Sequence, residues 1–281
     1  MMLYQLSHVR VSHADYRRLS VGLHAPFRLR ASGNHARPHR HLVEHRGSVE
    51  DDQSPAGAGR RPLALGLLGR VGTRIPIDLR SLIDPSHTAL LTVEVQEAVV
   101  GARAALPALS EAVAASDMLP NIAALARAAR AVGVPVVHCT AESRADGFGA
   151  NRNSKLFAVA AKARTGKPAP PGVFDVHADV GASPTDIVLP RLHGASPMAG
   201  TSLDTVLRNE GITTIVATGV SVNVALLGLV FDAVNRAYQV VVPRDAVCGV
   251  DPGYVNAVLE NTVSLLATLT TTKDVLGVWN A

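Results

Sequence analysis

The sequence is poor in cysteine, in charged residues and in long apolar runs. Cys139 and Cys248 are the only cysteines among 281 residues, which excludes a disulfide framework and a thiolate cluster for structural zinc. No apolar run reaches the roughly 18 residues of a membrane-spanning helix, so we expect no membrane partner. Because 47% of the residues are hydrophobic and 18% charged, a chain disordered throughout is also excluded. We expect a cytoplasmic protein, since thiols stay reduced there.

The positive charge is concentrated in the first part of the chain. Residues 1–80 hold thirteen arginines, no lysine and six acidic residues, whereas residues 81–281 hold fourteen basic and seventeen acidic residues. Seven of the eleven histidines also fall within the first fifty residues, where no apolar periodicity persists. We therefore predict a disordered, Arg/His-rich extension at residues 1–75 and a folded domain at 76–281.

Other interpretations of this extension stay open. An organelle transit peptide fits the arginine bias, and a start codon assigned too far upstream would produce the same change of composition. A phosphate-binding arm is a third alternative. Aromatic residues for base stacking are sparse in the segment, so nucleic acid is not the expected partner.

From about residue 76, short β-branched runs alternate with alanine- and leucine-rich segments. The runs are apolar throughout, which indicates strands buried on both faces of a parallel sheet. They lie at 88–95, 134–140, 186–190, 213–220, 238–243 and, more weakly, 274–279. We predict a three-layer α/β/α sandwich with a mostly parallel, Rossmann-like sheet.

Helices are predicted between these strands, at 117–132, 201–210, about 223–236 and 252–269. Ser116 is a candidate N-cap, and Gly133 and Gly211 are candidate stop signals. The stretch 141–185 is polar, contains proline and is too long for a simple connection. We expect it to form a lid or substrate loop, or to be partly disordered.

Three sequence blocks stand out within the predicted domain. They are LLTVEVQ (90–96), DIVLPRLHGASPMAGTSLDTVL (186–207) and TIVATGVSVNVALLGLVFDAVNRAYQVVVPRDA (214–246). Together they resemble the signature blocks of the isochorismatase-like hydrolase superfamily, often called cysteine hydrolases. The resemblance covers roughly residues 76–280, and it implies the same α/β fold, a hydrolase activity on a small molecule and a homo-oligomer.

The resemblance also implies which positions do the chemistry. Most members use an aspartate after the first strand, a lysine after the third and a cysteine nucleophile after the TGV turn. The corresponding residues here are Glu94, Arg191 and Ala225, so all three differ. A non-proline cis peptide bond is implied at Val220–Ser221.

Each substitution has a chemical consequence. Ala225 cannot act as a nucleophile, a loss that typically costs about 10⁶ in turnover, so an acyl-enzyme route is excluded. We interpret both cysteines as buried structural thiols. Glu94 keeps a carboxylate for general acid–base catalysis, and Arg191 favours the binding of an anion. A structural salt bridge left from a former active site accounts for the same pair equally well.

The substrate is expected at the carboxyl ends of the strands, where ligands of an open parallel sheet bind. The candidate contacts are Gln96, Val220, Ser221, Asn223 and Val224. Backbone amides near Val224 and Ala225 would favour negative charge. Relatives with a metal use an aspartate and two histidines after the second strand, whereas this chain has only His138 there, in a position typical of a core histidine. We expect no metal and no other cofactor.

Two functions remain open at this point. The first is a hydrolase of a small carboxylated or amide-like metabolite that works without a cysteine, with Glu94 as the proton-handling residue. The second is a catalytically inactive family member that binds a small molecule or serves as a structural or regulatory subunit. The isochorismatase family has precedent for the first, because its true isochorismatases protonate a vinyl ether with the aspartate and carry no thiol at that place.

Overall fold

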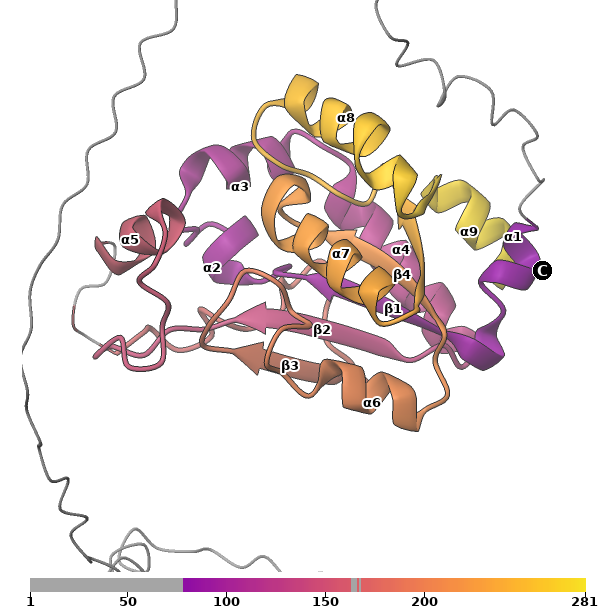
Figure 1. Ribbon diagram of the computed structural model, residues 1–281, viewed down its shortest axis with the longest axis horizontal. Helices are drawn as coiled ribbons and strands as arrows, with labels where there is room; N and C mark the ends of the chain where they lie inside the picture. Colours follow the sequence, from indigo (N-terminus) through magenta and orange to yellow (C-terminus); the bar gives the residue numbers. More distant parts are fainter. Residues whose placement is uncertain (1–77, 163–165, 167) are drawn as a thin grey trace, which may run out of the picture. The chain divides into compact units, whose positions relative to one another are not determined.

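The structure is a computed structural model that describes residues 78–162, 166 and 168–281, and its core is a six-stranded sheet (Figure 1). The strands are β1 (Thr88–Val93), β2 (Val136–Ala141), β3 (Ile187–Arg191), β4 (Thr214–Gly219), β5 (Gln239–Pro243) and β6 (Thr268–Thr270). Neighbouring strands pair in parallel, in the order β3-β2-β1-β4-β5-β6. The predicted sheet is confirmed, whereas the predicted extension at 1–75 lies outside the described residues.

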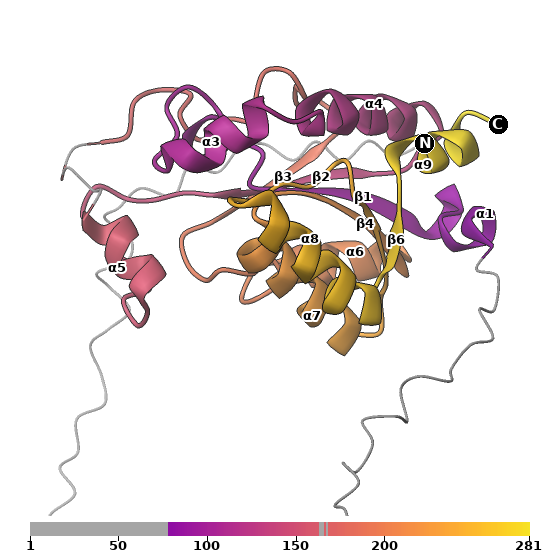
Figure 2. The same cartoon turned by 90° about the horizontal axis from the view of Figure 1, so that it is seen from above.

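Helices cover both faces of this sheet. Figure 2 shows α3, α4 and α9 on one side and α6, α7 and α8 on the other, which is the predicted three-layer sandwich. The helices are α1 (Leu79–Leu82), α2 (Glu97–Val100), α3 (Pro107–Ala114), α4 (Met118–Ala131), α5 (Lys155–Lys162), α6 (Leu203–Asn209), α7 (Leu227–Asn235), α8 (Pro252–Asn261) and α9 (Thr272–Trp279), with shorter turns η2 (Pro85–His87), η3 (Val222–Leu226) and η4 (Val263–Leu265). None of the described helices has the length and apolar character needed to cross a membrane.

Strand β1 is buried along its whole length because a layer of helices covers each of its faces. Leu91 and Val93 contribute to the core beneath α6, α7 and α8. Leu90 contributes to the opposite core, beneath α4 and α9. Each buried leucine side chain contributes about 1.5–3 kcal/mol. The apolar runs that form β1 and β4 are therefore strands with two covered faces, whereas the first four residues of the edge strand β3 are alternately partly buried and exposed.

The strand order reverses between β1 and β4. From β1 the chain moves outward through β2 to β3, and it then returns to β4 and continues through β5 to β6. The segment after β1 leads to α2 on one face of the sheet, and the segment after β4 leads to η3 and α7 on the other. A crevice opens at such a point, beyond the carboxyl ends of the two central strands.

The weak strand predicted at 274–279 is wrong, because these residues belong to α9. Thr271 caps the helix by accepting a hydrogen bond from the Asp274 N–H at 3.2 Å. Val275 and Trp279 lie four residues apart and are both buried, which is a helical spacing.

The helix predicted at 252–269 is too long. Helix α8 ends at Asn261, and Thr268–Thr270 instead form the edge strand β6. Threonine is β-branched and favours a strand, a signal that the apolar periodicity of the preceding residues obscured.

Most of the apolar side of α7 faces the sheet. Leu229, Val230 and Ala233 are buried in the core, whereas Phe231 is exposed. Core packing accounts for most of this stripe, so the homo-oligomer stays a prediction.

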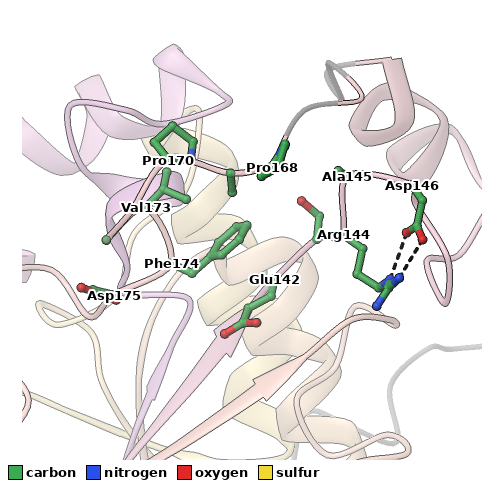
Figure 3. Close-up of a pocket in the computed structure, with 12 residues that line it drawn as sticks. Glu142, Arg144, Ala145, Asp146, Pro168, Pro170, Val173, Phe174 and Asp175 are labelled. Atoms are coloured by element: carbon green, nitrogen blue, oxygen red, sulfur yellow. Dashed lines mark hydrogen bonds and ion pairs between the residues drawn. The ribbon is translucent and has the colours of Figure 1, made fainter. Parts of the chain in front are cut away.

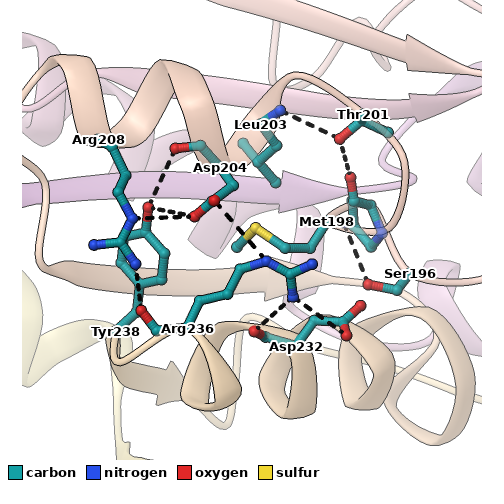
Figure 4. A network of polar contacts seen from close by, with 10 residues as sticks. Ser196, Met198, Thr201, Leu203, Asp204, Arg208, Asp232, Arg236 and Tyr238 are labelled. Carbon is teal, nitrogen blue, oxygen red and sulfur yellow. Dashed lines mark hydrogen bonds and ion pairs between the residues drawn. The ribbon is translucent and has the colours of Figure 1, made fainter.

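A polar network joins α6 to the start of β5, at the amino ends of the strands (Figure 4). Tyr238 donates its hydroxyl to Asp204 at 3.0 Å, and the guanidinium of Arg208 stacks over the Tyr238 ring at 4.8 Å. Burial and the neighbouring Asp204 raise the pKa of Tyr238 to about 12, which keeps the hydroxyl a donor. Arg236 extends the network to Asp232 on α7 at 3.5 Å. The network fastens helices to the sheet at the end opposite to the carboxyl ends of the strands.

Gly219 ends β4 in a conformation that favours glycine. Its φ is 101°, and a Cβ there would lie 2.3 Å from the carbonyl oxygen of Val93. We expect Gly219→Ala to lower the free energy of unfolding by about 3 kcal/mol or more in urea denaturation. Gly277→Ala in α9 is the matched control, since its Cβ meets no neighbour within 4 Å and alanine should be neutral or stabilising. Equal effects of the two substitutions would contradict this close approach of β1 and β4.

Candidate functional site

A cavity of about 490 Å³ opens at the carboxyl ends of β1, β3 and β4. Glu94 follows β1, Arg191 ends β3, and Ser221 and Val224 follow β4; all four line the cavity. The rest of the lining comes mainly from residues 98–109 and 141–195. The structure thus brings together, at one hollow, residues that lie far apart in the sequence.

Glu94 has a left-handed backbone conformation, with φ 54°. Its N–H donates to the carbonyl oxygen of Cys139 on β2 at 2.9 Å, which ties the residue to the sheet. A non-glycine residue in this conformation costs about 1–3 kcal/mol, and such residues cluster at functional sites. The side chain is 19% exposed and contributes to the cavity wall.

Arg191 forms an ion pair with Glu94 across the end of β2. Its Nη2 donates to Glu94 Oε1 and, at 3.1 Å, to the carbonyl oxygen of Ala195. Its Nη1 donates to the carbonyl oxygen of Thr140 at 3.5 Å. The side chain is only 2% exposed, and Nε is buried without a partner in the described part of the chain. The guanidinium group therefore bonds to one carboxylate and two backbone carbonyl groups of the protein, and almost none of it is exposed to a ligand.

Burial raises the pKa of Glu94 above its ordinary value, and the guanidinium of Arg191 opposes this shift. The carboxyl group consequently keeps its proton to a higher pH than an exposed glutamate does. Oε1 contacts Arg191, and Oε2 has no protein donor among the described residues. A carboxyl group of raised pKa with one uncommitted oxygen is suited to give or take a proton.

The turn after β4 contains a cis peptide bond between Val220 and Ser221, as the family resemblance implies. The carbonyl oxygen of Ser221 accepts hydrogen bonds from the N–H groups of Val224 at 3.1 Å and Leu226 at 3.2 Å. The Val224 amide expected to favour negative charge is therefore already paired. Ser221 and Val224 still reach the cavity with other atoms.

Four of the sequence-predicted residues do not line this cavity. Gln96 is fully buried, and its amide group exchanges hydrogen bonds of 2.7 and 2.6 Å with the backbone of Ala141, which fastens the end of β1 to β2. Val220 and Ala225 are buried in the two opposite cores. Asn223 lies on the first turn of η3 and is half-buried. The side chains of Gln96, Val220 and Ala225 therefore bond the backbone or pack in the core instead of facing a ligand.

Most of the cavity wall was not predicted from the sequence. Leu106, Phe157, Phe174 and Leu192 line it, and they come from α5, the residue before α3 and the connections around β3. The length of the stretch 141–185 predicted a lid or substrate loop, or partial disorder, but no motif indicated which of its residues face the site.

A second hollow of about 590 Å³ adjoins the cavity and shares Glu142 and Phe174 with it (Figure 3). At its side, Arg144 forms an exposed ion pair of 2.7 Å with Asp146. A hydrogen bond from Arg144 lowers the pKa of the Asp146 carboxyl well below its usual range. This arginine is therefore also paired with an acidic residue.

Both cysteines are buried free thiols, as predicted from the sequence. Cys139 is buried in β2, and burial raises its pKa to about 12. Burial also raises the pKa of Cys248. Neither lines the cavity, and a protonated buried thiol is a poor nucleophile.

His138 belongs to a closed network instead of a metal site. Its Nδ1 lies 2.7 Å from Thr92 Oγ1, and its Nε2 lies 3.1 Å from Asp186 Oδ2. Asp186 in turn accepts a 2.6 Å hydrogen bond from Arg130. Thr92 and His138 are both about 1% exposed, so no substrate reaches them. No group of three or more potential metal ligands occurs among the residues that the structure describes.

We expect His138 to make the protein less stable in acid. Burial lowers the pKa of His138, so the folded state favours the neutral ring. Its contribution to stability is full above about pH 6.5, the value in an unfolded chain, and is lost as the pH falls through the lower folded pKa. Urea denaturation at about pH 7.5 and pH 5 should show a smaller loss of stability for His138→Asn than for wild type. His193→Gln, at an exposed position, should keep the wild-type loss, and identical losses in all three proteins would contradict the assignment.

The described domain is similar to known proteins in sequence and in fold. A family model described as the isochorismatase domain matches residues 88–274. No curated protein matches the chain. A cysteine hydrolase structure from Pseudomonas syringae pv. phaseolicola is 23% identical, with a TM-score of 0.61 over 71% of this chain and 95% of that one. An isochorismatase family protein from Burkholderia thailandensis is 25% identical, with a TM-score of 0.57 over 70% and 97%. These similarities support the α/β fold.

Proposed function

Because the chain belongs to the isochorismatase domain family, we propose that it is a hydrolase of a small carboxylated or amide-like metabolite that works without a cysteine nucleophile. Glu94 is its general acid and base. The observation that supports this proposal is the Glu94–Arg191 pair at the wall of the cavity. The carboxyl group has a raised pKa, a guanidinium beside it and access to a ligand.

The proposed chemistry uses water as the nucleophile. For an amide, Glu94 takes a proton from water as the water oxygen bonds to the carbonyl carbon, and it gives that proton to the leaving nitrogen as the C–N bond breaks. Arg191 stabilises the Glu94 carboxylate before the first step and after the second. The sequence indicated anion binding by Arg191, whereas its contacts direct it first to Glu94.

A catalytically inactive ligand-binding protein is the second candidate. The observation that favours it is Ala225, which is 2% exposed and carries no reactive group at the family's nucleophile position. In this case the Glu94–Arg191 pair is a structural ion pair beside a binding cavity.

A metabolite panel separates the two functions. The purified protein is incubated with small amides, ureas and vinyl ethers, each with and without a carboxylate group. Products are detected by mass spectrometry, and thermal stability is recorded with each compound. We expect turnover of at least one compound. A ligand that raises the melting temperature while no compound is hydrolysed would support the inactive protein and contradict the hydrolase.

A further inference from the structure

We propose that the cavity selects an uncharged ligand with a hydrocarbon body, and that Arg191 is a positioning residue for Glu94 that does not bind a ligand carboxylate. This inference rests on the proposed function, because it names the substrate class of the same site. Of the two substrate classes in the proposed function, this inference selects the amide-like class and not the carboxylated one.

Arg191 has no donor pair free for a carboxylate. Two-pronged recognition of a carboxylate needs two N–H groups on one edge of the guanidinium. Nη2 is occupied by Glu94 and by the Ala195 carbonyl, Nη1 faces the Thr140 carbonyl, and the side chain is 2% exposed. A ligand carboxylate would have to displace Glu94, which would leave that buried carboxylate without its partner.

The second arginine of the cavity is paired as well. Arg144 donates from Nε and Nη2 to the two carboxylate oxygens of Asp146, at 2.9 and 2.7 Å. Among the described lining residues, both guanidinium groups therefore already contact a carboxylate. Glu142 also lines the cavity and has no ion-pair partner among the described residues, so an anionic ligand would meet like charge there.

The walls of the cavity favour the hydrocarbon part of a ligand. Apolar side chains from several segments surround the cavity: Val99, Leu106, Leu156, Phe157, Phe174 and Leu192. A volume of about 490 Å³ with mostly apolar walls and a few polar groups is typical of a small-molecule site. An aryl or branched alkyl group of the ligand suits these walls. The amide group of the same ligand then lies against Glu94.

Matched pairs of probes test this inference on the full-length protein. Isothermal titration calorimetry at about pH 7.5 compares phenylacetamide with phenylacetate and isovaleramide with isovalerate, each pair sharing one hydrocarbon body. We expect each amide to bind about tenfold more tightly than its carboxylate. Equal or tighter binding of the carboxylates, or no binding of either amide at millimolar concentration, would overturn the inference.

The role of Arg191 has a separate readout. The infrared carboxyl signal of Glu94 is assigned by difference from Glu94→Gln. In Arg191→Met this signal should titrate at higher pH than in wild type, and in Arg191→Lys it should return most of the way to the wild-type pH. An unchanged titration, or a loss of affinity confined to carboxylate probes, would show an anion clamp instead. Circular dichroism checks that each variant folds.

Failure of this inference can be told apart from failure of the proposed function. Preferential binding of the amides without hydrolysis of any compound leaves the inference standing and removes the hydrolase. Hydrolysis confined to carboxylated compounds leaves the hydrolase standing and overturns the inference.

Discussion

Replacing Glu94 by glutamine should lower kcat/KM by about 10²- to 10⁴-fold on the best substrate of the panel, because glutamine keeps the size of the side chain and cannot transfer a proton. Glu94 is the carboxyl group that contacts Arg191 at the cavity wall, and burial raises its pKa above the ordinary value. The loss should appear in kcat with little change in KM. Circular dichroism should show an unchanged fold.

Glu260→Gln is the matched control for this experiment. Glu260 also pairs with an arginine, Arg244, but outside the cavity. The control should keep turnover within about threefold of wild type. If Glu94→Gln and Glu260→Gln had equally small effects, Glu94 would not be the proton-handling residue.

Asp186→Ala should have a large effect on stability and lower the free energy of unfolding by about 3 kcal/mol or more. The Asp186 side chain is 1% exposed and accepts hydrogen bonds from Arg130, from His138 and from the Ser183 N–H. Burial acts to raise the pKa of Asp186, but these hydrogen bonds outweigh it and hold that pKa below its ordinary value. Alanine would leave His138 Nε2 and Arg130 Nε without their acceptor. Urea denaturation at neutral pH measures the loss.

Asp146→Ala provides the comparison for Asp186. Asp146 also pairs with an arginine, but both side chains are more than half exposed, so water replaces the lost contact. We expect no measurable change in the free energy of unfolding. A loss of stability as large as that of Asp186→Ala would show that burial does not determine how much these ion pairs contribute to the free energy of unfolding.

The sheet could be predicted from the sequence because its central strands are buried on both faces. Residues 88–93 are buried at every position, and a short, almost wholly apolar run bounded by turn residues is typical of such a strand. The strand predicted at 274–279 was wrong because the pattern there is ambiguous. The segment DVLGVW suits a short strand as well as a helix, and the Thr271 cap stabilises the helix α9.

The candidate site could be predicted only in part. Glu94 and Arg191 lie at the ends of parallel strands on either side of β2, so the topology brings them to one edge. The orientation of the neighbouring side chains could not be read in the same way. Gln96 follows Glu94 by two residues, yet it turns into the sheet to bond Ala141, because the left-handed Glu94 breaks the regular alternation of a strand.

The central claim, hydrolysis without a thiol, is tested most directly by the turnover of the cysteine-free variant Cys139→Ala/Cys248→Ala, checked for folding by circular dichroism. Both thiols are buried with raised pKa, so we predict kcat/KM within about threefold of wild type. A folded variant whose turnover falls to the level of Glu94→Gln would contradict the account.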